Sequence, residues 1–206
     1  MKLAIVGRAG HGKDTIGEAV IALGAQRVAF ADPIKEMACT GLGISREVLW
    51  GPAEVKEQVV ERYGVTTRHI LQTLGTEWGR NCVDQDIWVK RAIDHTIPQW
   101  ESAGVLDFVV TDVRFLNEAE LLREAGFVIV RVERPGYGPS PTTWWERCLH
   151  AATFGLLGRV EHQSESELAR IEEDVKILND GTVDDLKRKA RALANRARRE
   201  HWPEGR

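Results

Sequence analysis

Hydrophobic positions along the chain fall into short apolar runs that alternate with segments of helical spacing. The run Leu3 to Val6 is apolar at every position and ends at Gly7, which is typical of a fully buried strand. The segment after it predicts a helix from Asp14 to Leu23, with Gly24 as its stop. The alternation continues, which predicts further strands near 26–30, 105–111, 127–132 and 175–178, and helices near 66–79, 84–100, 117–125 and 182–199.

Strands that alternate with helices predict an α/β fold with a doubly wound parallel sheet. In such sheets, ligands bind at the carboxyl ends of the strands. Gly7 and Asp112 each stand at the end of a predicted strand. We therefore expect these two residues to face the same crevice.

A cluster of prolines and glycines between residues 135 and 141 predicts an excursion of the chain over the surface. The segment 142–158 that follows is apolar and aromatic, but Glu146, Arg147 and His150 interrupt it. It is too short and too charged to span a membrane. We expect a lid helix or a packing surface there, and the apolar stretch is the reason to consider a homodimer.

Composition narrows the classes of protein to which the chain can belong. Its 206 residues, with 43% apolar and 29% charged side chains, are enough for one well-buried domain. A net charge of −3 gives no general affinity for nucleic acid polymers or anionic membranes. The three cysteines lie far apart without a C-x-x-C pair, and the N-terminal apolar run is too short for a signal peptide. These features predict a cytoplasmic protein.

The residues from Gly7 to Thr15 read GRAGHGKDT and nearly match a phosphate-binding loop. Such a loop works because its glycines let backbone N–H groups converge on phosphate oxygens at a helix N-terminus. Lys13 would add a mobile positive charge for the β and γ phosphates. The spacing of Gly7, Gly12 and Lys13 favours this function over a glycine-containing turn with a surface lysine.

Asp14 stands where the usual loop has a serine or threonine whose hydroxyl contacts Mg²⁺. A carboxylate is also an acceptable oxygen ligand for Mg²⁺, directly or through water, and the adjacent Thr15 can share this task. The alternative is that Asp14 is only an acidic residue favoured in the first turn of a helix.

Asp112 closes an apolar strand, which is where phosphoryl-transfer enzymes carry a second carboxylate on the metal side. Arg114 follows on the same side of an extended chain. The alternative is a helix N-cap followed by an exposed arginine.

Other candidates come from the helical middle of the chain and from the residues just after the strand near 127–132. Guanidinium groups bind phosphates bidentately, so a second anion cluster is possible among Arg68, Arg80, Arg91 and Arg134. Trp88 offers a flat face on which a base can stack, whereas Trp78 is expected in the core.

Five stretches of the sequence together resemble a known family. They read GRAGHGKDT, FADPIKEMA, RHILQTLGTEWGRNCVDQDIWVK, VVTDVRFLNEAELLREAG, and HQSESEL followed by DVKILNDGT. In this order they are similar to the deoxynucleoside monophosphate kinases of tailed bacteriophages, a branch of the P-loop kinases related to adenylate kinase. An aspartate directly after the loop lysine, as at Asp14, is a feature of that family.

The resemblance implies a single P-loop kinase domain over residues 1–206, with a three-layer α/β/α core around a parallel sheet. It also implies a helical acceptor-binding region at about 45–100 and a lid-like insertion at about 135–165. The implied reaction is ATP plus a deoxynucleoside monophosphate (dNMP) giving ADP plus the diphosphate, with ATP and Mg²⁺ as cofactors. Small nucleotides would be the partners, without a nucleic acid polymer or a membrane.

The resemblance also assigns roles to individual residues. It places the donor nucleotide on Gly10, His11, Gly12, Lys13, Asp14 and Thr15, with Asp14 and Thr15 at the metal and Asn179 at the edge of the adenine. It places the acceptor on Arg68, Gly75, Trp88, Asp112 and Arg114. The residues it implies as catalytic are Lys13, Asp14, Asp112 and Arg114.

Two other functions are compatible with the same loop. One is a kinase of another phosphorylated acceptor, such as dephospho-CoA or phosphomevalonate, which acceptor competition would distinguish. The other is a nucleotide-binding switch or motor component that hydrolyses ATP or GTP without an acceptor. The absence of an obvious charged surface for a partner weighs against this second alternative.

Overall fold

The computed structural model describes residues 1–136 and 167–199, which belong to two compact units. The first unit combines Met1–Val28 with Trp100–Arg206, and the second is Ala29–Gln99. Most of the lid-like insertion expected at about 135–165, and the whole of the apolar segment 142–158, lie outside the described residues. The expectation that residues 1–206 form one domain stays a prediction.

The first unit is built on a five-stranded sheet in the order β2-β5-β1-β6-β7, in which every neighbouring pair is parallel. This confirms the predicted α/β class with a parallel sheet. The strands are short, and the inner strands β1 and β5 are almost continuously apolar, as expected where helices cover both faces. The strands are β1 (Lys2–Val6), β2 (Gln26–Val28), β5 (Phe108–Val110), β6 (Val128–Glu133) and β7 (Val175–Leu178).

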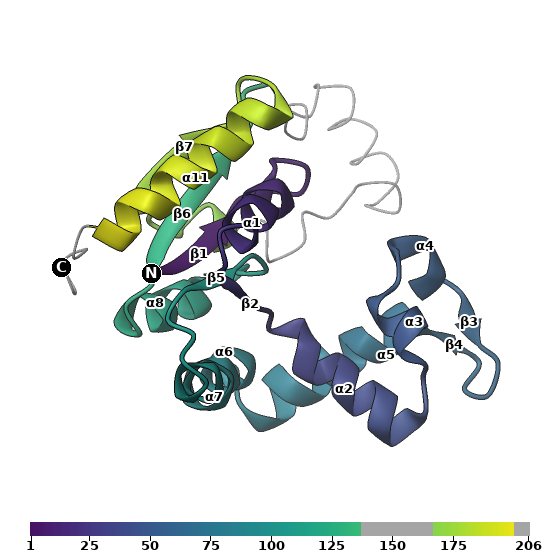
Figure 1. Ribbon diagram of the computed structural model, residues 1–206. Coiled ribbons are helices and arrows are strands. Elements are labelled where there is room, and N and C mark those ends of the chain that lie inside the picture. The colour runs from purple at the N-terminus through teal and green to yellow at the C-terminus, as the bar shows by residue number, and fades with distance from the viewer. Residues whose placement is uncertain (137–166, 200–206) are drawn as a thin grey trace. The chain divides into compact units, whose positions relative to one another are not determined.

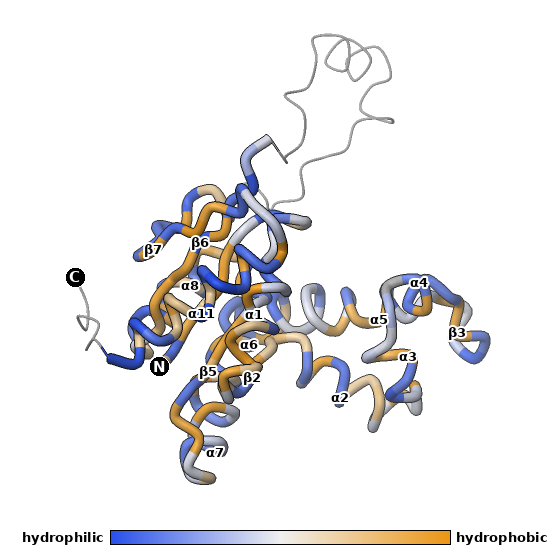
Figure 2. Tube along the Cα trace, turned by 45° about the horizontal axis from the view of Figure 1, so that its top comes forward, coloured by the Kyte–Doolittle hydropathy of each residue, from blue (hydrophilic) through white to orange (hydrophobic). Residues whose placement is uncertain are grey.

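Helices pack against both faces of this sheet. On one face, α1 (Lys13–Ile21) and α11 (Val183–Arg199) lie side by side, and α8 (Leu116–Glu124) lies on the other face (Figure 1). Alternate strand residues such as Leu3, Val109 and Val130 join the core beneath α1 and α11. Figure 2 shows the resulting run of hydrophobic residues along β6. The three layers expected from the sequence are therefore present.

The strand before Asp112 is shorter than its apolar pattern predicts, because β5 begins at Phe108 rather than at Val105. The preceding helix α7 (Ile97–Ser102) ends in a turn in which the backbone N–H of Val105 donates to the carbonyl of Trp100. Leu106 is 69% exposed, so its apolar side chain does not belong to the sheet. The backbone N–H of Val105 is therefore already hydrogen-bonded within the turn, and it is not available to extend β5 towards the N-terminus.

The second unit is mainly helical, with one small antiparallel hairpin. Ala38, Ile44, Leu49 and Ile70 form its buried core cluster. Its elements are α2 (Ala31–Leu42), α3 (Arg46–Trp50), α4 (Ala53–Lys56), β3 (Val59–Val60), β4 (Val65–Thr66), α5 (Thr67–Gln72), η1 (Thr73–Val83), α6 (Ile87–Arg91) and η2 (Ala92–Thr96). The segments η1 and η2 are π-helical, which the helical spacing at 66–79 and 84–100 did not predict.

Across residues 1–136 and 167–199, no helix is both long enough and apolar enough to cross a membrane.

Candidate active site

The loop between β1 and α1 has a backbone path that requires glycine. Gly10 and Gly12 have φ angles of 77° and 104°, and Gly12 is the N-cap of α1. A Cβ atom on Gly12 would lie 2.7 Å from Leu186 Cδ2, and one on Gly7 would lie 2.6 Å from the carbonyl oxygen of Val132. The glycines thus allow the loop backbone to pass close to β6 and α11 and to lead into the N-terminus of a nine-residue helix, an arrangement that suits phosphate binding.

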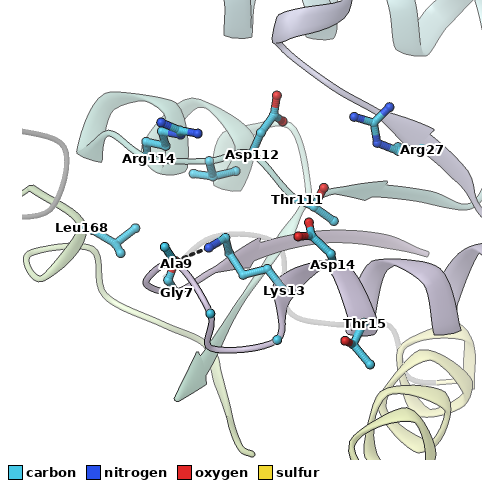
Figure 3. A pocket seen from close by; sticks show the side chains of 13 residues that line it. Gly7, Ala9, Lys13, Asp14, Thr15, Arg27, Thr111, Asp112, Arg114 and Leu168 are labelled. Carbon is cyan, nitrogen blue, oxygen red and sulfur yellow. Dashed lines mark hydrogen bonds between the residues drawn. The ribbon is translucent and has the colours of Figure 1, made fainter. Parts of the chain in front are cut away.

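Lys13 is held against this loop. Its Nζ atom donates a hydrogen bond to the carbonyl oxygen of Gly7 at 2.7 Å (Figure 3). It also donates to the carbonyl oxygen of Arg8 at 2.9 Å. These bonds place the ammonium charge over the start of the loop instead of leaving it at the end of a mobile side chain. A positive charge in this position is suited to the phosphate chain of a nucleotide.

His11 and Asn179 support the loop from the side of β6 and β7. His11 is 7% exposed, and its Nδ1 atom lies 3.4 Å from both the Val132 carbonyl oxygen and the Arg134 backbone nitrogen. The side-chain amide of Asn179 donates to the carbonyl oxygen of His11 at 3.0 Å. Neither residue is among those that line the pocket described next. Their expected contacts with the donor nucleotide stay a prediction.

A pocket of about 580 Å³ opens beside the loop at the carboxyl ends of the strands (Figure 3). It confirms the expectation that Gly7 and Asp112 face one crevice. Of the predicted site residues, the pocket brings together Gly10, Gly12, Lys13, Asp14, Thr15, Asp112 and Arg114. Its other lining residues are Gly7, Ala9, Arg27, Thr111, Val113 and Leu168.

The pocket wall from Asp112 to Arg114 is fixed by a buried carboxylate. Glu118 is 2% exposed, and its Oε2 atom accepts hydrogen bonds from the backbone N–H groups of Arg114 at 2.8 Å and Phe115 at 3.2 Å. Phe115 is the N-cap of α8, so the alternative interpretation of Asp112 as an N-cap is wrong. A glutamate at the third position of a helix is a known capping signal, and it could have revealed Glu118 in the sequence.

The pocket lining also includes Leu168, which sequence reasoning missed. Arg131 on β6 holds the segment around it, because its Nη2 atom donates to the carbonyl oxygens of Leu168, at 3.3 Å, and of Ile171. Arg131 also donates from Nε to Glu173 at 2.7 Å, and this hydrogen bond lowers the pKa of the Glu173 carboxyl. These contacts join residues about forty positions apart, so no local pattern signals them.

Two pocket residues offer oxygen ligands for a divalent cation. Asp14 contributes a carboxylate and Thr15 a hydroxyl, next to the phosphate-binding loop. Within residues 1–136 and 167–199, no group of three or more His, Cys, Asp or Glu side chains is placed to hold a metal ion. This donor set fits Mg²⁺, which is usually bound by one or two protein oxygens together with phosphate oxygens and water.

Three of the expected acceptor residues lie in the second unit. Arg68 forms an exposed ion pair with Glu57. Trp88 is 3% exposed, and its indole N–H donates to the carbonyl oxygen of Gly75 at 2.7 Å. The roles of Arg68, Gly75 and Trp88 in acceptor binding stay a prediction. The expectation that Trp78 belongs to the core is wrong, since its side chain is 42% exposed.

The arginines expected to form a second anion cluster are divided between the two units. Arg68, Arg80 and Arg91 belong to residues 29–99, and Arg91 donates to Thr96 Oγ1 at 3.1 Å. Arg134 belongs to the first unit. The cluster therefore stays a prediction.

Comparison with known proteins identifies the family. The family model for deoxynucleotide monophosphate kinase matches residues 49–153. A protein of Acanthamoeba polyphaga mimivirus, named as a deoxynucleotide monophosphate kinase, is 30% identical over 195 residues that cover 89% of this chain and 91% of that protein. The chain belongs to the deoxynucleotide monophosphate kinase family. The resemblance inferred from its five sequence stretches is thereby confirmed.

Two further similarities accompany this family assignment. The deoxynucleoside-5'-monophosphate kinase of Escherichia phage T5 is 40% identical over 72 residues, which are 35% of this chain and 27% of that kinase. The dephospho-CoA kinase of Campylobacter jejuni superposes with a TM-score of 0.49 at 16% identity, covering 95% of this chain and 96% of that one. The match to the kinase family model includes Arg68, Gly75, Trp88, Asp112 and Arg114.

Proposed function

We propose that the protein transfers the γ-phosphoryl group of ATP to a deoxynucleoside monophosphate in a reaction that requires Mg²⁺. The observation that carries the proposal is the pocket in which a phosphate-binding loop with Lys13 and Asp14 meets Asp112 and Arg114. Membership in the deoxynucleotide monophosphate kinase family supports the choice of acceptor. Small nucleotides are then the partners of the protein, and the cytoplasm is where it would meet them.

The donor half of the site is the loop with the first turn of α1. The backbone N–H groups around Gly12 and the positive end of the helix dipole would bind the β and γ phosphates of ATP. Lys13 would add its charge from above the loop. Asp14 and Thr15 would hold the metal, which when bound neutralises charge on the phosphates.

The acceptor half of the site is the wall from Thr111 to Arg114. Arg114 supplies a guanidinium group for the acceptor phosphate or for the transferring group, and Glu118 fixes the backbone of that wall. Asp112 comes two residues after the end of β5, which pairs with β1, the strand that leads into the loop. It would orient the acceptor or face the metal, as the family resemblance implies.

The chemical step needs alignment more than covalent help from the protein. An oxygen of the acceptor phosphate attacks the γ-phosphorus, and the bond from that phosphorus to the oxygen bridging the β and γ phosphates breaks, which releases ADP. The attacking oxygen is already ionised at neutral pH, so no general base is required. The task of the pocket is to hold the two nucleotides in line and to stabilise the charge.

The deciding experiment is ADP production from ATP and Mg²⁺ with each dNMP and each NMP in turn, beside a reaction without acceptor. We expect turnover only with certain dNMPs. Equal rates without any acceptor would instead indicate an NTPase. Turnover with dephospho-CoA or phosphomevalonate, but with no nucleotide, would indicate a kinase of another acceptor.

Lys13→Ala tests the role of the loop. We expect turnover to fall on the order of 10²- to 10³-fold, because the variant loses a preorganised charge at the transferring phosphate. Lys187→Ala is the matched control, since Lys187 lies on α11 and does not line the pocket. Near-normal turnover in a folded Lys13→Ala protein would contradict the assignment of the loop.

The homodimer stays a prediction, because the segment 142–158 that motivates it lies outside the described residues. Sedimentation at micromolar concentration tests it, and a monomer would count against it.

A further inference from the structure

Arg27 lines the pocket although neither the loop motif nor the family resemblance assigns it a role. It is the middle residue of the short strand β2, which forms one edge of the sheet. Its guanidinium group reaches into the pocket from the strand on the far side of β5, towards the side where Asp14 and Asp112 lie (Figure 3).

The register of the sheet explains why an arginine at this position reaches the site. Arg27 pairs with Val109, and Val109 pairs with Leu3, so all three side chains point to the same face of the sheet. Leu3 and Val109 are buried in the core that α1 covers. Arg27 is exposed, and β2 is an edge strand with a neighbour on one side only. A long side chain there can extend past α1 to the pocket.

The strand order decides which half of the pocket Arg27 serves. The phosphate-binding loop follows β1 in the middle of the sheet, and Asn179 follows β7 at the opposite edge. Arg27 approaches from β2, which pairs with β5, the strand that leads to Asp112 and Arg114, and Asp112 lies between the two arginines (Figure 3). In the proposed reaction the loop binds the phosphates of the donor. The anionic group that Arg27 can bind is therefore the phosphate of the acceptor.

We propose that Arg27 binds the phosphate group of the dNMP acceptor and, together with Arg114, holds it in line with the γ-phosphorus of ATP. The inference rests on the proposed function. A guanidinium group suits this task because its N–H donors match two phosphate oxygens at once, which fixes direction as well as position. The Arg27 guanidinium group also adds a third positive charge to those of Lys13 and Arg114. The same pocket holds the carboxylates of Asp14 and Asp112.

The test compares steady-state kinetics of the wild type, Arg27→Gln and Arg27→Lys, using the dNMP that the wild type phosphorylates fastest. We expect Arg27→Gln to raise the KM for the dNMP roughly 10- to 100-fold, as for the loss of a charged hydrogen bond, while the KM for ATP changes less than about twofold. Arg27→Lys keeps the positive charge but loses the paired N–H donors of the guanidinium group. Its KM for the dNMP should therefore lie between those of the wild type and Arg27→Gln. Arg191→Gln, an exposed arginine on α11 outside the pocket, is the matched control and should behave as the wild type.

A second readout separates phosphate binding from a structural effect. The corresponding deoxynucleoside, which lacks the phosphate, is used as a competitive inhibitor of the wild type and of Arg27→Gln. We expect equal inhibition constants, because the nucleoside has no group that Arg27 contacts. If Arg27→Gln raises the inhibition constant of the nucleoside by the same factor as the KM for the dNMP, the inference is overturned. An unchanged KM for the dNMP would overturn it as well. Both of these results leave the kinase activity standing, whereas a wild type that phosphorylates no dNMP would overturn the proposed function and this inference with it.

Discussion

Gly17→Ala probes the packing that positions the end of β5. Gly17 is buried on α1, and a Cβ atom there would lie 2.6 Å from Thr111 Cγ2. Carbon atoms in contact are normally about 3.5–4.0 Å apart, so the added methyl group must push Thr111 or α1 aside. Threonine is stiff at χ1, and this makes the adjustment costly.

Two opposing effects set the size of the change in stability. Alanine in place of glycine inside a helix stabilises it by up to about 1 kcal/mol. Forcing an additional methyl group into a packed core costs about 1–3 kcal/mol. Taking the middle of the second range, we expect Gly17→Ala to lower the free energy of unfolding by about 1 kcal/mol. Gly41→Ala is the control, because a Cβ there would meet no atom within 4 Å beyond its chain neighbours and the backbone of its own helix, and it should be neutral or stabilising.

Removing the opposing methyl group should reverse the loss. Thr111→Ser lacks the Cγ2 atom, so the double variant Gly17→Ala with Thr111→Ser should be about 1–3 kcal/mol more stable than the sum of the two single changes predicts. Urea unfolding followed by circular dichroism measures all four proteins, and equal slopes make the midpoints comparable. If Gly17→Ala gains stability as Gly41→Ala does, or if the two changes are simply additive, the close approach of α1 to β5 is not what we describe.

Two further changes test polar contacts. The pKa of Glu173 lies below its ordinary value because Arg131 donates to it, so its contribution to stability is complete above the usual glutamate pKa of about 4.3 and is lost as the pH falls through the lowered value. Glu173→Gln should therefore lose less stability than the wild type between neutral pH and about pH 3. If the urea midpoints of the two proteins fall by the same amount over this range, the hydrogen bond from Arg131 to Glu173 does not stabilise the protein. Trp88→Phe removes the donor to the Gly75 carbonyl and leaves a smaller ring in a buried site, which should cost about 1–3 kcal/mol of unfolding free energy. An unchanged urea midpoint would show that the hydrogen bond does not stabilise the protein.

Most of the parallel sheet was predictable because its inner strands follow a local pattern, although β5 begins later than that pattern predicts. A strand buried on both faces needs apolar side chains at nearly every position, and the runs at Leu3 to Val6 and at 127–132 have this composition. The phosphate-binding loop was predictable for a similar reason. Its glycines, its lysine and its helix N-terminus are neighbours along the chain, so their spacing already defines their geometry.

The two tryptophans of the second unit show that residue type alone does not decide which side chain is buried. Trp78 was expected in the core, yet it is 42% exposed, while Trp88 is 3% exposed. Trp78 lies in η1, a π-helical segment from Thr73 to Val83. A π-helix has a wider turn than an α-helix, so it shifts the face that each later residue presents. The expectation for Trp78 rested on the usual role of an isolated tryptophan, which takes no account of such a shift.

Arg27 and Leu168 belong to the site for reasons that no local pattern contains, whereas Glu118 stands at the third position of α8, where a local capping signal exists. Glu118 matters because it is buried against the backbone of the pocket wall. Arg27 reaches the pocket because β2 is an edge strand beside β5, and Leu168 because Arg131 holds its segment from another strand. The amino-acid sequence alone was enough for the fold class, the phosphate-binding loop and the carboxylate at the end of β5, since each depends on neighbours in the chain. The tertiary structure decided which further side chains share the pocket, because strand order and register bring together residues that are distant in the chain.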